Sequence, residues 1–279
     1  MSGSLIIVAT PIGNLGDLTP RALAVLQSAD VVYCEDTRRT RTLYSANALK
    51  VAHLVALHEH NEMSQIAEII TRITKGETVA LVSDAGTPGI SDPGSRVVAA
   101  VVDAGLVVTT APGASAVIAA LGISGLPTDR FVMEGFVPRK GAERSAWLNG
   151  WDSEQRTIVF YESPKRIAAT VAELADRWPD RRIAVVRELT KLHEEVFRST
   201  PVELARRLAS GEIQGEITVV LAGAPPAAPV SEQLILEAVD NALGEGTSVR
   251  DVATQVSDAL GVPHRVVYEL ALQRRTTKA

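Results

Sequence analysis

The sequence predicts an α/β protein with two sheet-containing domains and a small helical C-terminal appendage. Apolar, strand-like runs alternate with amphipathic, helix-like stretches over most of its 279 residues, as in a helix-covered sheet. The proline-rich segment 224–229 then separates this part from a region with only helical patterns. We therefore expect domains at 1–112 and 113–224 and a helical appendage at 230–279.

The first domain is predicted to hold a mostly parallel sheet. Thr19 followed by Pro20 is typical of a helix start, because the hydroxyl caps the helix and proline suits its first turn. Apolar residues at helical spacing predict a second helix at 63–73, and a third is expected at 92–105. The short β-branched runs between these helices predict strands at 5–9, 31–34, 53–57, 79–82 and 106–109.

The second domain repeats the alternation with more charge. Helices are expected at 164–176 and 201–210, each with a proline near its start. Strands are expected at 131–135, 157–161, 183–187 and 217–221, and an additional strand at 194–199 makes this sheet mixed. In the appendage, helices are predicted to start near Ser231, Ser248 and Pro263.

Composition excludes several classes of protein. With 46% hydrophobic and 22% charged residues, the chain is neither disordered nor fibrous. A single cysteine, Cys34, excludes a disulfide framework and a cysteine-rich zinc site. The apolar run 5–9 is too short for a signal peptide, and glycines and prolines interrupt the uncharged stretch 104–128. We therefore expect a cytoplasmic protein, and its net charge of -5 argues against bulk coating of nucleic acid while leaving room for a local basic patch.

Three loops rich in glycine and proline follow predicted strands, at 10–17, 83–94 and 111–116. Ligands of open α/β sheets bind beyond the carboxyl ends of the strands, where these loops lie. The loop 83–94 is much longer than the 2–6 residues usual for such a connection, which favours a ligand-binding role over an ordinary turn.

These loops do not form a known phosphate-binding motif. The first has Gly-x-x-Gly rather than Gly-x-Gly-x-x-Gly, and no Gly-Lys-Ser/Thr follows a strand. A nucleoside-type ligand held by backbone groups and small side chains fits this pattern better than a triphosphate.

The three loops resemble those of the tetrapyrrole methylase superfamily, which uses S-adenosylmethionine. Further segments are similar to one branch, the ribosomal RNA small subunit methyltransferase I family: Glu35-Asp36-Thr37-Arg38, His58-Glu59-His60-Asn61-Glu62, Glu134-Gly135-Phe136, Phe160-Tyr161-Glu162-Ser163 and Arg187-Glu188-Leu189-Thr190-Lys191. The resemblance runs from about residue 5 to residue 222. It implies a two-domain tetrapyrrole-methylase-like fold, a homodimer, a cofactor in the cleft between domains, and 2′-O-methylation of a cytidine ribose in the decoding region of 16S (small-subunit) ribosomal RNA.

The resemblance also implies cofactor contacts on all three loops and on the second domain. The methionine part of the cofactor is expected at the second loop, and its adenosine against Tyr161. Leu189 and Thr218 are expected on the adenine side, with simple strand packing as their alternative. The full set is Pro11, Asp84, Ala85, Thr87, Ser115, Ala116, Tyr161, Leu189 and Thr218.

A ribose hydroxyl is a poor nucleophile while protonated, so a base near it is expected to help. The ionisable groups at two strand ends supply the candidates, and we expect the base among Glu59, His60 and Glu62. The others are His58, Asp36 and Glu188. Helix capping by Asn61, with Glu62 in the first turn, is the alternative. His58 and His60 are two residues apart rather than four apart on a helix, so we expect no zinc site.

Basic residues beside the expected cleft are candidates for contacts with RNA phosphates, which position a nucleic acid without reading its sequence. Each also has an alternative role as part of an ordinary solvated surface. The candidates are Arg38, Arg41, Arg139, Lys140, Lys165 and Arg166.

The expected substrate is small-subunit ribosomal RNA within the assembled subunit, because an acidic chain is poorly suited to gripping free RNA. Two rival functions remain at this stage. One is methylation of a corrin or porphyrin precursor, and the other is a non-catalytic RNA-binding assembly module. The sequence leaves open the exact nucleotide, the catalytic base and the role of the appendage.

Overall fold

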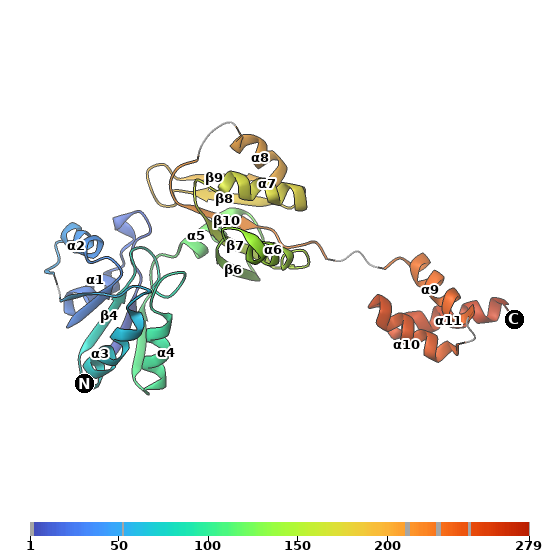
Figure 1. Cartoon of the computed structure of the whole chain (residues 1–279), viewed down its shortest axis with the longest axis horizontal. Helices are drawn as coiled ribbons and strands as arrows, with labels where there is room; N and C mark the ends of the chain where they lie inside the picture. Colours follow the sequence, from blue (N-terminus) through green and yellow to red (C-terminus); the bar gives the residue numbers. More distant parts are fainter. Residues whose placement is uncertain (1–2, 52, 210–212, 227–229, 245–246, 279) are drawn as a thin grey trace. The chain divides into compact units, whose positions relative to one another are not determined.

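A computed structural model describes residues 3–51, 53–209, 213–226, 230–244 and 247–278. The chain divides into two units, Met1–Ala224 and Pro225–Ala279. The first unit contains two five-stranded sheets, and the described part of the second consists of helices (Figure 1). The expected division of the first unit between residues 112 and 113 stays a prediction.

The first sheet is parallel throughout, in the order β3-β2-β4-β1-β5. Because all its strands run in one direction, the loops that follow them meet at one edge of the sheet. The predicted parallel sheet is thus confirmed, with strand ends shifted by one or two residues. The strands are β1 (Ser4–Val8), β2 (Val31–Cys34), β3 (Leu54–Ala56), β4 (Thr78–Val82) and β5 (Val107–Ala111).

Helices cover both faces of this sheet (Figure 1). On one face, alternate strand residues such as Leu5 and Tyr33 pack against α3 (Glu62–Thr74) and α4 (Ser95–Asp103). On the other face, residues such as Val32 pack against α1 (Pro20–Ser28) and α2 (Thr37–Ala46). The period of two along each strand therefore divides its side chains between two apolar cores.

The helix α2 was not predicted, because its sequence is mostly polar and only Thr40 and Tyr44 are buried. Its start is set by Asp36, whose carboxylate accepts a hydrogen bond from the Arg38 amide at 2.8 Å. The helix expected from residue 92 begins only at Ser95, since the backbone at Gly94 adopts φ 132°. A short 3-10 helix, Leu15–Asp17, follows β1.

The second sheet is mixed, as predicted, in the order β6-β7-β10-β8-β9. Only β6 and β7 are parallel, and the expected additional strand, β9, pairs antiparallel with β8 at the edge. The strands are β6 (Phe131–Phe136), β7 (Thr157–Glu162), β8 (Ile183–Arg187), β9 (Glu195–Ser199) and β10 (Ile217–Leu221).

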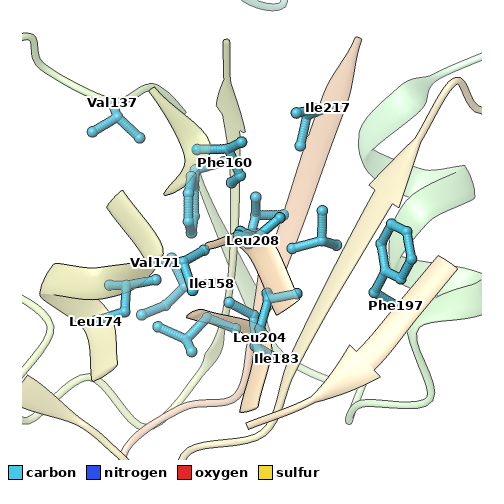
Figure 2. Close-up of a cluster of buried hydrophobic side chains, with 14 of the residues drawn as sticks. Val137, Ile158, Phe160, Val171, Leu174, Ile183, Phe197, Leu204, Leu208 and Ile217 are labelled. Atoms are coloured by element: carbon cyan, nitrogen blue, oxygen red, sulfur yellow. The ribbon is translucent and has the colours of Figure 1, made fainter. Parts of the chain in front are cut away.

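Helices also cover both faces of the second sheet. One face packs on α5 (Ala116–Ser124), and the other on α6 (Gly141–Asn149), α7 (Ile167–Arg177) and α8 (Pro201–Leu208). Figure 2 shows apolar side chains of β7, α7 and α8 gathered in the larger core. The helices α5 and α6 were not predicted. In α5, apolar residues occur on all sides, so the sequence has no helical period.

The second unit contains α9 (Glu232–Gly244), α10 (Val249–Leu260) and α11 (His264–Lys278) in its described part. They enclose a small core that includes Val239, Val252 and Val267. The Ser248 hydroxyl caps α10 by accepting from the Asp251 amide at 3.2 Å. Among the described residues, no helix has the length and apolarity needed to cross a membrane.

Replacing Gly223 with alanine is expected to destabilise the first unit strongly. Gly223 follows β10, and a Cβ there would overlap the backbone carbonyl of Gln155. We expect the Gly223→Ala variant to lose at least about 2 kcal/mol of unfolding free energy in a urea titration. Gly122→Ala is the matched control, because no atom of the described chain lies within 4 Å of a Cβ in that helical position. The unfolding free energy of the Gly122→Ala control should rise by up to about 1 kcal/mol. Equal losses of unfolding free energy in both variants would contradict the steric argument.

Candidate active site

A cavity of about 470 Å³ lies within the first unit. Its lining combines loops from the carboxyl edge of the parallel sheet with residues of β7, β10 and the segment after β8. The predicted cofactor contacts that line it are Asp84, Ala85, Thr87, Ser115, Ala116, Tyr161, Leu189 and Thr218. The remaining one, Pro11, lines a smaller hollow that shares Asp84 and Ala85 with the cavity. Residues far apart in sequence are thus brought to one site.

The long loop 83–94 is fixed to its neighbours by backbone contacts. Thr10 and Gly86 exchange two backbone hydrogen bonds, at 2.8 and 3.0 Å, which link the first and second loops. The Thr87 hydroxyl donates to the Ala114 carbonyl at 3.3 Å, which links the second loop to the third. The three glycine-rich loops therefore form one connected wall of the cavity.

Glu62 fixes the far end of the same loop. Its side chain is only 4% exposed, and its Oε1 accepts from the amides of Gly94, Arg96 and Val97 at 3.0, 3.2 and 3.4 Å. These amides belong to the start of α4, where backbone donors lack helical partners and a negative charge is favourable. Glu62 does not belong to the cavity lining, so its predicted role as base gives way to a structural role.

The neighbouring candidates for the base, Glu59 and His60, are exposed and do not belong to the lining of this cavity either. The turn that carries them is held by Asn61, whose Oδ1 accepts from the His58 amide at 2.8 Å and whose Nδ2 donates to the Ala56 carbonyl at 2.9 Å. The Asn61 side chain therefore closes the turn, rather than capping α3 as the alternative interpretation expected. Within the described ranges, no His, Cys, Asp and Glu side chains cluster in a way that could hold a metal ion.

Five carboxylates line the cavity, and three of them, Glu35, Asp84 and Asp92, belong to the loops of the parallel sheet. Asp84 accepts from the Asp36 amide at 3.0 Å and pairs with Arg39 at 3.4 Å. Burial, followed by the charge of Glu35, raises the pKa of Asp92 to about 6. Burial and the charge of Asp84 likewise raise the pKa of Glu35. Burial and nearby negative charge thus raise the proton affinity of Glu35 and Asp92 inside a partly enclosed site.

Sequence reasoning did not assign Glu35 or Asp92 to the site. Glu35 directly follows the last residue of β2, and Asp92 lies in the long loop after β4. The rule that ligands bind beyond the carboxyl ends of parallel strands points to both positions. Asp92 was instead interpreted as the start of a helix.

The second sheet contributes an aromatic wall. The rings of Tyr161 and Phe136 lie with their centroids 5.2 Å apart, and both line the cavity. Burial, followed by the charge of Asp92, raises the pKa of Tyr161 to about 12. The phenol therefore stays protonated at neutral pH and offers a flat surface with a polar tip.

Next to this wall, Glu162 has a fully buried side chain and several donors. It accepts from the Ser163 amide and from Arg166 Nε at 2.7 Å, and from the Thr170 hydroxyl at 2.6 Å. Arg166 also donates to the Val137 carbonyl at 2.7 Å. These contacts give Arg166 a structural role, because its guanidinium pairs with a buried carboxylate inside the fold, and its expected contact with RNA stays a prediction.

The segment after β8 carries backbone strain beside the cavity. Glu188 and Thr190 adopt φ 51° and 65°, on either side of Leu189, which lines the cavity. The turn is held by the Glu188 carboxylate, which accepts from the Glu216 amide and from Lys191 Nζ, both at 2.9 Å. Non-glycine residues in this region cost free energy and cluster at functional sites.

A second hollow, of about 750 Å³, lies between the start of α6 and α7. We call it the basic groove; its basic lining residues are Arg139, Lys140, Arg144, Lys165, Arg166 and Arg177. Arg144 and Arg177 form ion pairs within the fold. Arg139, Lys140 and Lys165 are exposed and have no ion-pair partner among the residues that the structure describes. The groove thus gathers three free cations that were predicted to contact RNA.

The other two predicted RNA contacts, Arg38 and Arg41, are exposed on α2. Arg38 pairs with Asp36 at 2.7 Å, and this contact holds the pKa of Asp36 at about 2. Between them, Arg39 turns toward Asp84 and lines the cavity, which the sequence did not reveal.

Comparison with known proteins gives a consistent result. Residues 4–205 match the family described as Tetrapyrrole (Corrin/Porphyrin) Methylases. A Mycobacterium tuberculosis protein is 47% identical over 277 residues, covering 98% of this chain and 96% of its own length. A Synechocystis protein is 40% identical over 274 residues, which cover 97% of this chain and 98% of its own length. Both relatives are named ribosomal RNA small subunit methyltransferase I.

Solved structures share the fold at lower identity. A diphthine synthase has a TM-score of 0.61 and 19% identity, covering 79% of this chain and 90% of that one. Another is a uroporphyrin-III C-methyltransferase from Thermus thermophilus complexed with S-adenyl homocysteine. It has a TM-score of 0.54 and 18% identity, and the match covers 78% of this chain and 96% of that one. At these identities the structures support the fold alone.

The structural role of Glu62 predicts a large effect on stability. Removing its carboxylate in a Glu62→Ala variant leaves amides at the start of α4 without their acceptor. We expect a loss of about 2–3 kcal/mol of unfolding free energy, measured by urea titration monitored by circular dichroism. Glu59→Ala is the control, because it removes an exposed carboxylate three residues away. Its unfolding free energy should stay within about 0.5 kcal/mol of that of the parent. A stable Glu62→Ala protein would show that these hydrogen bonds do not hold the loop.

Proposed function

The chain belongs to the tetrapyrrole methylase family and, within it, to the ribosomal RNA small subunit methyltransferase I family, and on this premise we propose that it methylates small-subunit ribosomal RNA with S-adenosylmethionine. One observation of the structure carries the proposal. All the residues expected to contact the cofactor except Pro11 line a single cavity, beside a segment with strained backbone at Glu188 and Thr190.

The cavity suits the chemistry of this cofactor. Its volume of about 470 Å³ lies in the range of small-molecule sites. Apolar and aromatic side chains such as Phe136 and Leu189 match an adenosine, and the carboxylates Glu35 and Asp84 match its positively charged sulfonium and ammonium groups. Ser115, at the start of α5, makes no side-chain cap in the described structure, so amide donors there remain for the cofactor's carboxylate.

When bound, the cofactor supplies an electrophilic methyl group on a good leaving group. The protein's main contribution is therefore orientation, which is worth up to about 7–11 kcal/mol in ideal cases. Tyr161 orients the adenosine, and Leu189 and Thr218 contact the adenine. Asp84, Ala85 and Thr87 hold the methionine part, Ser115 and Ala116 bind its carboxylate, and Pro11 borders the cleft.

The target in this proposal is the 2′-hydroxyl of a cytidine ribose in the decoding region, methylated in the assembled small subunit. Family membership supports RNA as the substrate class. The net charge of -5 supports the assembled subunit over free RNA, because an acidic chain gains little from coating a polyanion.

RNA phosphates are proposed to bind in the basic groove through Arg139, Lys140 and Lys165. These side chains are exposed and lie outside the ion pairs of the described fold, so their charge is available for phosphate. Arg38 and Arg41 on α2 provide further phosphate contacts in this proposal.

We also propose a cytoplasmic homodimer. Exposed apolar side chains on α4 and on the edge strand β5, such as Val102 at 56% and Val107 at 52%, support a surface that another copy covers. Sedimentation at micromolar concentration measures this state directly, and a monomer across that range would contradict it.

The first experiment measures transfer of labelled methyl from S-adenosylmethionine to small subunits purified from a strain that lacks this protein. We expect label on one ribose hydroxyl of a decoding-region cytidine. Tetrapyrrole precursors are assayed side by side, and label there instead would establish the first rival function. Binding to the subunit with bound cofactor and no transfer would indicate a non-catalytic assembly module.

The basic groove makes a separate prediction. A variant with Arg139→Gln, Lys140→Gln and Lys165→Gln should raise KM for small subunits by about tenfold, with kcat nearly unchanged. Each lost phosphate contact should reduce the slope of log affinity against log salt by about 1. Lys75→Gln is the control, because Lys75 is an exposed cation that follows α3, far along the chain from the groove. Equal salt slopes in the triple variant and in the parent would exclude this groove as the phosphate site.

A further inference from the structure

We propose that Asp92 is the general base that removes the proton from the ribose hydroxyl as this oxygen is methylated. The inference rests on the proposed function and identifies the residue that sequence reasoning sought at Glu59, His60 and Glu62. It follows from the positions of the ionisable groups around the cavity and from the contacts that each of them makes.

Asp92 lies in the long loop after β4, and its side chain lines the cavity together with Glu35 and Tyr161. The side chain of Ser83, at the other end of the same loop, lowers the pKa of the Asp92 carboxyl. The group therefore faces the space proposed for cofactor and substrate, with a defined neighbour and without a cationic partner among the described residues.

The other cavity carboxylates are engaged more fully. Asp84 accepts from a backbone amide at 3.0 Å and pairs with Arg39 at 3.4 Å. Glu162 is fully buried and bound to Arg166 and to further donors. The oxygens of both carboxylates already accept from these donors, which leaves fewer lone pairs to take a proton from a substrate hydroxyl.

Two further groups of the lining are poor candidates for other reasons. The Glu216 side chain is 72% exposed and pairs with Lys191 at 3.0 Å. The pKa of Tyr161 is raised to about 12, so its phenolate is scarce at neutral pH. Glu35 feels the positive charge of Arg39, whereas the charges that act on Asp92 are those of Glu35 and Asp84, so Asp92 is the cavity carboxylate without a cationic neighbour among the described residues.

The surroundings also give Asp92 a suitable proton affinity. The groups that face it are Glu35 from the end of β2, Ser83 and Asp84 from its own loop, and Tyr161 from β7. Burial and the charges of Glu35 and Asp84 raise the pKa of Asp92 to about 6, and the Ser83 contact lowers it. A base with a pKa just below the working pH is mostly ionised yet accepts a proton readily.

The fold also holds Asp92 in place. Two residues further along the chain, the Gly94 amide donates to the buried Glu62 carboxylate at 3.0 Å. A Cβ at Gly94 would meet Leu81 at 2.9 Å, so the loop lies close against β4 at this point. Glu62 is thus a positioning residue that acts on the base through the loop.

In the proposed step, Asp92 takes the hydroxyl proton as the ribose oxygen forms its bond to the methyl carbon. The electron pair of the broken carbon–sulfur bond remains on sulfur, and the carboxylic acid then releases its proton to water. Atoms and charge balance without a metal or another reactant.

The test compares Asp92→Asn with the parent in single-turnover methyl transfer to small subunits between pH 5 and 9, at saturating cofactor. The parent rate should rise through about pH 6 and then level off. The variant should be slower by about 100- to 10,000-fold and lose this rise. Cofactor affinity, measured by calorimetry, should change by less than about twofold, and Asp92→Glu should restore part of the rate. Asp103→Asn, an exposed position at the end of α4, is the matched control and should keep the parent rate.

A second readout needs neither cofactor nor RNA. In a carbon-13 NMR titration of the parent protein alone, the carboxyl signal that Asp92→Asn removes should titrate with a midpoint near 6. Glu35→Gln removes one negative neighbour and should lower this midpoint. A midpoint near 4 in the parent would overturn the proposal.

The outcomes separate this inference from the proposed function. If the parent transfers methyl and Asp92→Asn matches it at all pH values, Asp92 is not the base and the proposed function stands. If the variant loses rate and cofactor affinity in the same proportion, Asp92 is a binding residue and the inference is wrong. If the parent itself transfers no methyl to small subunits, the proposed function fails, and the inference fails with it.

Discussion

The hydrogen bonds from the start of α4 to the buried Glu62 carboxylate are the interaction on which the site depends. They join the segment after β3 to the long loop after β4, and so connect the ends of two strands that lie on either side of β2 at the carboxyl edge of the sheet. The backbone pairing of Thr10 with Gly86 adds the loop after β1. With both ends held, a loop that is longer than an ordinary connection keeps one shape and presents Asp92 to the cavity.

The sequence predicted most strands from strong local signals, and the family resemblance predicted most of the residues that line the cavity. A buried parallel strand has a short apolar run, and the residue that follows it must lie at the carboxyl edge. Helix α2 was not predicted because few of its side chains are buried, so it has no apolar face. Helix α5 was not predicted because most of its side chains are apolar, so no one face stands out. The roles of Glu62 and Arg166 depend on partners in other elements or on buried charge, which spacing along the chain does not encode.

The cavity also shows how one cluster of carboxylates can serve different purposes. Asp84 is stabilised as an anion by an amide and by Arg39, and Glu162 by Arg166 and hydroxyl donors. Asp92 has no such cation among the described residues, and burial, followed by the negative charge of Glu35, raises its pKa to about 6. The surroundings thus divide the cavity carboxylates into groups that pair with a guanidinium and a group whose proton affinity is raised.

The basic groove and the cavity are lined by adjacent residues of one short segment, which links the proposed RNA site to the proposed cofactor site. Pro164 lines the cavity, and the next residue, Lys165, lines the groove. Glu162 and Arg166 hold this connection from both sides through their ion pair of the (i, i+4) type. A phosphate bound at Lys165 would therefore lie one residue from the cofactor wall, on a turn whose backbone is already fixed. Because orientation is the main demand of methyl transfer, a rigid link of this kind places the nucleic acid relative to the methyl donor without a separate closing motion.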